Sequence, residues 1–154
     1  MPYLRGETAK PDHCVFCAKV EADDAQEYVV FRSQHVYATL NRYPYNNGHL
    51  LIVPYQHVGD IEDLPLETLT DLMRTAQQSV AALRAIYHPE AFNIGINIGP
   101  AAGAGIAEHF HLHVVPRWAG DTNYMTIVGQ TRVIPEMLEE TYHRLREAWP
   151  QQHE

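Results

Sequence analysis

The sequence predicts an α+β fold in which an antiparallel sheet of about five strands is covered by two main helices. Two blocks of strand-like segments are each followed by a segment whose apolar residues recur with helical spacing, and this order is typical of such layered folds. The chain of 154 residues is long enough for one hydrophobic core but hardly for two. We therefore expect a single domain over residues 1–154, in which the polar and non-periodic residues 1–13 form an N-terminal arm.

The first block contains three expected strands. Glu27–Ser33 and Val36–Asn41 are rich in Val, Phe and Tyr, and His49–Pro54 repeats this pattern after the turn-forming residues Asn46, Asn47 and Gly48. Because only short turns separate the three segments, we expect them to form an antiparallel meander.

The clearest expected helix runs from Pro65 to Tyr87, where apolar residues recur at steps of three and four. Apolar and polar residues then alternate from Phe92 to Gly99, which is typical of a strand with one polar face. A further strand is expected over Glu108–Pro116, after the loop of small residues Pro100–Ala107. A closing helix is expected to begin near Pro135.

The net charge argues against a nucleic acid polymer as partner and requires local hydrogen-bond donors for any small anionic ligand. Lys and Arg number 11 against 19 Asp and Glu, which gives a net charge of -8 and no general attraction for a nucleic acid polymer. A small anionic nucleotide suits the chain better, provided that backbone N–H groups and imidazoles supply local donors. The sequence contains neither an apolar run of the roughly 20 residues that span a bilayer nor a signal peptide, so we expect a cytoplasmic protein without a membrane partner.

Three histidines alternate with apolar residues in the last expected strand. The two-residue period of a strand places His109, His111 and His113 on one face, and Phe110 and Leu112 on the other. Residues on one face follow each other at about 6.6 Å, so neighbouring rings can engage different atoms of one phosphate chain. A single histidine is more often structural, and histidines on one face of a strand also suit zinc. Phosphate chemistry and a metal site can share this strand.

Imidazole suits the transfer of a phosphate-linked group. As a neutral nucleophile it approaches an anionic phosphorus without charge repulsion, and the phosphoramidate that it forms is readily cleaved again. The attacking nitrogen must be unprotonated. The other ring nitrogen should therefore donate a hydrogen bond to a carbonyl group, which fixes the tautomer.

Cys14 and Cys17 are the only cysteines, so a disulfide framework is excluded. Their spacing is that of a zinc knuckle, but a tetrahedral site needs two further ligands. A thioredoxin-like redox pair is the alternative. It usually lies between a strand and a helix, whereas a polar arm precedes this pair, and zinc is favoured.

Two segments resemble the histidine-triad (HIT) superfamily of nucleotide hydrolases and transferases. His109–His113, continued by Val114-Val115-Pro116-Arg117, resembles its signature, and Asn41–Pro54 looks like its substrate-binding hairpin. The resemblance implies a HIT-like sheet.

The resemblance also implies roles for individual residues. His111 matches the nucleophile, and His113, the second expected catalytic residue, matches the group that contacts the phosphates and the leaving group. His49 matches a residue that lines the same pocket, Asn41 one that reaches the ribose, and Asn97 one that binds the reacting phosphate. From the residues alone, Asn41 is a turn former and Asn97 an outward polar residue of a strand.

Zinc-bearing members of the superfamily complete their metal site with two histidines that match His57 and His109. The resemblance thus implies a structural zinc on Cys14, Cys17, His57 and His109, because four protein ligands leave no open position for catalysis. No organic cofactor is expected.

The segment after the triad resembles one branch of the superfamily. Trp118–Met125, running on to Val133–Glu136, is similar to bacterial diadenosine tetraphosphate phosphorylases, and Trp118 is expected to border the nucleotide unless it simply packs at the rim. Gly105 lies in a loop whose backbone N–H groups can approach a phosphate, at a position where relatives often carry Gln or Ser. His113 is retained where many transferases of the superfamily carry Gln.

We therefore expect a nucleotidyl transferase that cleaves diadenosine tetraphosphate with inorganic phosphate, the expected acceptor, to ATP and ADP through a nucleotidyl-histidine. The first alternative is a dinucleoside polyphosphate or nucleoside phosphoramidate hydrolase that uses water. The second is a non-catalytic nucleotide-binding or zinc-binding module. We expect a homodimer or homotetramer.

Overall fold

The computed structural model describes residues 14–122 and 136–151. The expected arm over residues 1–13 therefore lies outside the described residues. The same holds for residues 123–135, which include most of the segment that resembles the phosphorylase branch and the expected helix start near Pro135.

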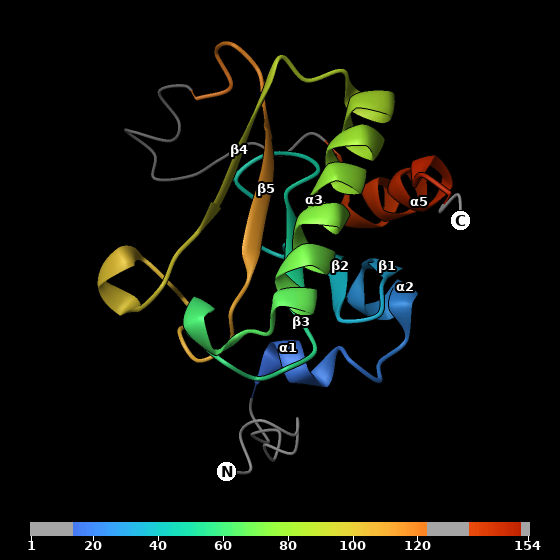
Figure 1. The fold of residues 1–154 in the computed structure, drawn as a ribbon. Coiled ribbons are helices and arrows are strands. Elements are labelled where there is room, and N and C mark those ends of the chain that lie inside the picture. Colours follow the sequence, from blue (N-terminus) through green and yellow to red (C-terminus); the bar gives the residue numbers. More distant parts are fainter. Residues whose placement is uncertain (1–13, 123–135, 152–154) are drawn as a thin grey trace.

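Five strands form one antiparallel sheet in the order β1-β2-β3-β5-β4 (Figure 1). They are β1 (Val29–Arg32), β2 (Val36–Leu40), β3 (Leu50–Pro54), β4 (Ala91–Ile96) and β5 (Leu112–Arg117). The first three follow one another as a meander, which confirms the sequence prediction. Because β5 lies between β3 and β4, the histidine strand is placed next to the hairpin that begins at Asn41.

The two main helices pack side by side on one face of the sheet. The long helix α3 (Leu66–Tyr87) packs against β2, β3 and β5, and α5 (Leu138–Ala148) packs beside it against β1 (Figure 1). The shorter helical segments are α1 (Val15–Ala18), α2 (Asp24–Glu27), η2 (Ile61–Asp63) and η3 (Pro100–Ala102). The α+β class with two main helices is confirmed.

Strand alternation divides the buried residues into two clusters. Leu50 and Ile52 of β3 belong to the main core beneath α3. Leu51 and Val53 point to the other face and pack against Phe16 of α1 and its neighbours. Every residue of β3 is buried, because side chains of alternate parity have a partner layer on each side.

Two expected strand boundaries differ in the structure. The strand expected from Glu27 begins at Val29, because α2 continues to Glu27 and Tyr28 ends it with a φ of 55°. The strand expected from Glu108 begins at Leu112. Beyond the last ladder pair, Ile52 with Leu112, the N–H of Phe110 instead donates to the carbonyl of Val58 at 2.6 Å. Within the described residues, the closing helix begins at Leu138.

Gly48 closes the hairpin that delivers His49 to the start of β3. Its φ is +77°, and a Cβ at this position would lie 2.6 Å from Cδ2 of Leu83. Only glycine satisfies both the backbone conformation and the close approach of α3. Within the described residues, no helix is both long and apolar enough to cross a membrane.

Candidate active site and metal centre

The three histidines project from one side of the β5 segment. Phe110, Leu112 and Val114 all belong to the core beneath α3, so the alternating residues His109, His111 and His113 project to the opposite side. The expected alternation is confirmed, although the strand ladder begins only at Leu112. The ring centroids of His111 and His113 lie 5.0 Å apart, which is close enough for both rings to contact one phosphate.

The buried ring of His111 has a defined tautomer. Its Nδ1 lies 2.9 Å from the backbone oxygen of His109. Because a carbonyl oxygen can only accept, Nδ1 must carry a hydrogen, so the neutral form of the ring has its lone pair on Nε2. This is the arrangement that nucleophilic attack by Nε2 requires.

A chain of hydrogen bonds also orients His113. The backbone N–H of Tyr45 donates to Nδ1 of His49 at 3.1 Å, so the hydrogen of His49 lies on Nε2. That nitrogen donates to Nδ1 of His113 at 2.9 Å, which leaves the hydrogen of His113 on its own Nε2. This Nε2 is buried and has no hydrogen-bond partner in the part of the chain that the structure describes. It is a donor ready for a ligand oxygen.

Both of these rings are neutral near pH 7. Burial, with the nearby rings of His113 and His111, lowers the pKa of His49 to about 3. Burial and the neighbouring His111 lower the pKa of His113 to about 4. Because its ring is neutral, His113 can donate one hydrogen bond from Nε2 but carries no positive charge.

Two hollows lie near the rings of His111 and His113. The first, of about 410 Å³, is lined by Asn41 and by Phe16, whose ring centroid lies 4.9 Å from that of His111. The second, of about 350 Å³, is lined by Asn97 and His113. Asn41 also lies beside the histidine chain, with its Nδ2 3.5 Å from Nδ1 of His49. The structure therefore brings together the expected residues of the hairpin and the triad, with Asn97 directly after the end of β4.

Two expected substrate residues line neither hollow. Trp118 contacts Tyr87 edge-to-face, with ring centroids 6.3 Å apart, on the side of the sheet that α3 covers. Within this chain it lines neither hollow, which agrees with rim packing. Gly105 is exposed, and a Cβ there would have no neighbour within 4 Å, so a side chain could be accommodated.

Sequence reasoning missed a polar network that holds the site together. Asp121 accepts hydrogen bonds from Arg117 at 2.7 and 2.8 Å and from Asn46 at 2.7 Å. The guanidinium of Arg117 holds the pKa of Asp121 well below its usual range. Asn46 thus joins the hairpin to the end of β5, although its place beside Asn47 and Gly48 suggests only a turn.

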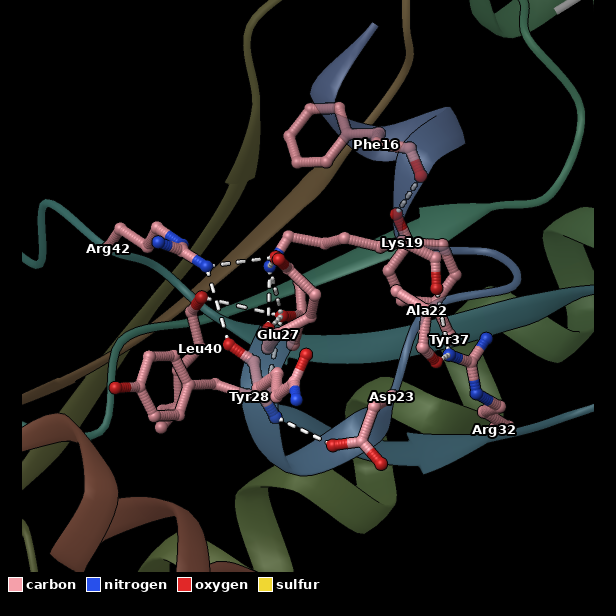
Figure 2. A network of polar contacts seen from close by, with 12 residues as sticks. Phe16, Lys19, Ala22, Asp23, Glu27, Tyr28, Arg32, Tyr37, Leu40 and Arg42 are labelled. Carbon is pink, nitrogen blue, oxygen red and sulfur yellow. Dashed lines mark hydrogen bonds and ion pairs between the residues drawn. The ribbon is translucent and has the colours of Figure 1, made fainter.

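A second network, made of charged side chains, was not predicted from the sequence. Lys19, Glu27 and Arg42 form a connected group of charges beside α2 (Figure 2). All three line the first hollow. They come from three separate segments, so no local pattern in the sequence joins them.

The four expected metal ligands converge. One ligand atom from each of Cys14, Cys17, His57 and His109 lies within 4.8 Å of all the others. Each cysteine Sγ lies 3.3 Å from a histidine Nδ1, Cys14 from His109 and Cys17 from His57. The Nδ1 atoms of His57 and His109 are 3.2 Å apart.

These separations suit a tetrahedral metal ion. With metal–sulfur bonds of about 2.3 Å and metal–nitrogen bonds of about 2.0 Å, tetrahedral angles place S and N about 3.5 Å apart and two nitrogens about 3.3 Å apart. The outer nitrogen of His109, Nε2, lies 2.8 Å from the backbone oxygen of Pro54, so its Nδ1 is free of hydrogen. The cluster can therefore hold a metal with sulfur and nitrogen ligands.

Residues 22–120 match the family model of the HIT domain. This match covers more than half of the chain. The chain belongs to the HIT family.

Relatives of this HIT protein agree with the assignment. It is 44% identical, over 86% of its length and 68% of the relative, to a protein of Mycobacterium tuberculosis named AP-4-A phosphorylase. It is 36% identical to an uncharacterised HIT-like protein of the same species, over 90% of this chain and 94% of the relative. A zinc-bound histidine triad family protein of Mycobacterium smegmatis superposes with a TM-score of 0.71 at 34% identity, covering 88% and 92% of the two chains. This HIT protein is thus an enzyme of a nucleotide-processing family.

Proposed function

We propose that this HIT enzyme transfers a nucleotide from a dinucleoside polyphosphate, diadenosine tetraphosphate, to inorganic phosphate through a covalent intermediate on His111. The orientation of the His111 ring carries the proposal. Its Nδ1 donates to the carbonyl of His109, so Nε2 presents a lone pair. A merely structural histidine has no need of a free ring nitrogen beside a second ring that presents a free donor.

The first transfer forms one bond and breaks another. Nε2 of His111 attacks the α-phosphorus, and the oxygen that bridges to the next phosphate leaves with the electron pair as ATP. The Nε2–H of His113 donates a hydrogen bond to this departing oxygen and stabilises its growing charge. AMP remains on His111 as a phosphoramidate. Inorganic phosphate then attacks the same phosphorus, which yields ADP and restores the free ring.

The lining residues suggest how the substrate lies. The nucleoside of the transferred nucleotide occupies the first hollow, with Asn41 beside the ribose. Asn97 lies with His113 in the second hollow, where its amide can bind the reacting phosphate. Backbone N–H groups of the loop at Gly105 complete the phosphate site.

The choice of phosphate as acceptor is supported by the 44% identical relative that bears the name AP-4-A phosphorylase. The alternative is hydrolysis, which the retained His113 and the missing side chain at Gly105 favour. Diadenosine tetraphosphate and labelled inorganic phosphate distinguish the two. We expect the label to enter ADP at the rate of ATP release. Unlabelled AMP as the sole partner of ATP, at a rate indifferent to phosphate, would establish hydrolysis.

The remaining alternative, a non-catalytic nucleotide-binding or zinc-binding module, disagrees with the membership of this chain in a family of enzymes. Its signature in the same experiment is nucleotide binding without release of ATP. The proposal requires turnover that disappears when His111 is replaced.

We further propose that the metal on Cys14, Cys17, His57 and His109 is a structural zinc, without any organic cofactor. The zinc-bound relative and the ligand separations support this choice. A four-coordinate zinc would supply no Lewis acid to the reaction. It would instead hold His109, whose backbone oxygen fixes the tautomer of His111.

The assembly is proposed as a homodimer or homotetramer. β4 is an edge of the sheet, and among the described residues no strand pairs with its outer side. Ile94 and Ile98 on or next to this edge are 46% and 38% exposed. Exposed edge strands are normally covered, and a second copy of the chain would cover this one.

A further inference from the structure

Lys19 is a buried cation whose hydrogen-bonding capacity is already used. Its Nζ donates to the backbone oxygen of Glu27 at 2.6 Å and to Oγ1 of Thr39 at 3.2 Å. It also lies 3.2 Å from Oε2 of Glu27 (Figure 2). These three acceptors match the three hydrogens of an ammonium group. Lys19 therefore fixes its neighbours and is not available to bind a phosphate.

The carboxylate of Glu27 is held by one of its oxygens. Oε2 lies 3.2 Å from Lys19 and accepts from Nη2 of Arg42 at 3.0 Å. Oε1 has no hydrogen-bond partner among the described residues. Burial alone would raise the pKa of Glu27, but the hydrogen bond and charge of Lys19, together with Arg42, hold this pKa below its ordinary value. At neutral pH the free oxygen is thus a pure acceptor.

Glu27 and Arg42 contribute charged groups to the lining of the first hollow. The rest of its lining includes Phe16, Leu51 and Ile106, which offer apolar surface to a flat ring. Phe16 marks the end beside His111. If the transferred phosphate lies at His111 and the ribose at Asn41, the base is directed towards the carboxylate and the guanidinium.

We propose that Glu27, held by Lys19 and Arg42, determines base specificity by accepting a hydrogen bond from the exocyclic amino group of adenine. This inference rests on the proposed function, since it takes the first hollow as the nucleoside site. Arg42 supplies the complementary donor, because Nε and Nη1 of its half-exposed side chain have no hydrogen-bond partner within the described residues. A ring nitrogen next to the amino group of adenine is the matching acceptor.

The single free oxygen favours adenine over guanine. The Watson–Crick edge of guanine places two donors side by side, and both would be satisfied best by a carboxylate with two free oxygens. In this protein, Oε2 of Glu27 already interacts with the cations Lys19 and Arg42. One free acceptor beside one free donor matches the edge of adenine.

The test removes the amino group from the ligand and, separately, the carboxylate of Glu27 from the protein. Isothermal titration compares AMP with purine riboside 5′-monophosphate, which differs only by hydrogen in place of the amino group. We expect the wild-type enzyme to bind AMP about tenfold more tightly or better, as is typical of a hydrogen bond to a charged acceptor. In Glu27→Ala the two affinities should agree within about twofold.

Three further variants make the comparison secure. Glu27→Gln keeps an acceptor oxygen and should retain part of the preference. Glu147→Ala, an exposed change on α5, should keep all of it. If Glu27→Ala fails to fold because Lys19 is left unpaired, the double variant Lys19→Met/Glu27→Ala removes both charges together.

The outcomes distinguish this inference from the function on which it rests. Equal binding of the two nucleotides by the wild-type enzyme overturns the role of Glu27 and leaves the proposed function standing. The same holds for an unchanged preference in a folded variant without the carboxylate. Failure of the wild-type enzyme to bind either nucleotide overturns both.

Discussion

Nε2 of His49 donates a hydrogen bond to Nδ1 of His113 across 2.9 Å, and this bond joins the residue before β3 to the second residue of β5. A proton on His113 would place two donors face to face, since Nε2 of His49 already carries a hydrogen. The backbone N–H of Tyr45 prevents the His49 ring from reversing its tautomer, because Nδ1 must accept from it. The pair is therefore held in one neutral arrangement.

This neutral pair should make stability depend on pH. The pKa values of His49 and His113 are about 3 and about 4 in the folded protein, against 6.5 for an ordinary histidine. Between pH 6.5 and about 4 the unfolded chain binds more protons, so the free energy of unfolding falls as the pH is lowered through this range. It falls by about 1.4 kcal/mol per pH unit for each such histidine.

Urea unfolding between pH 7 and 4.5 measures this slope. His49→Gln removes one of the titrating rings and should reduce the slope by about 1.4 kcal/mol per pH unit. Identical slopes in the two proteins would show that His49 is not held neutral by the fold.

Replacement of the nucleophile should separate binding from turnover. His111→Asn keeps a polar side chain but has no nucleophilic nitrogen, so we expect the fold and nucleotide affinity to persist while kcat falls about 10³-fold or more. Rapid quenching with labelled substrate should find an acid-labile nucleotidyl protein in the wild type only. Turnover near the wild-type rate in the variant would rule out His111 as the nucleophile.

The metal centre should be measurable directly. Elemental analysis of protein purified without added metal should find one zinc per chain, and Cys14→Ser should lose it. Loss of the metal frees His109 and with it the carbonyl that fixes His111, so we expect a lower melting temperature together with a lower kcat. If the purified protein contains no zinc and two titratable thiols, the assignment of a metal to this site is wrong.

The assembly should depend on β4. Sedimentation should find a dimer or tetramer, and Ile94→Lys should shift it towards monomer because it places a charge at the exposed edge. Ile61→Lys on η2, at a residue of similar exposure, serves as the control and should leave the assembly unchanged. A monomeric wild-type protein would contradict the expectation.

The sequence by itself determined the elements whose pattern is local. The helix expected over Pro65–Tyr87 is observed over Leu66–Tyr87, because the spacing of apolar residues depends only on helical geometry. The alternation through His109–His113 likewise predicted which rings share a face. The predicted start of the last strand was wrong by four residues. A strand begins where a partner strand is present, and no local pattern records where β3 ends.

Tertiary structure alone decided how separate segments meet. Resemblance to a family suggested His57 as a metal ligand, but only the pairing of β3 with β5 brings it within 3.2 Å of His109. No pattern of residues indicated that Lys19, Glu27 and Arg42 would meet at one wall of the first hollow. They are joined because α1, α2 and the hairpin pack against the same sheet, and a contact between distant segments depends on the whole fold rather than on any window of sequence.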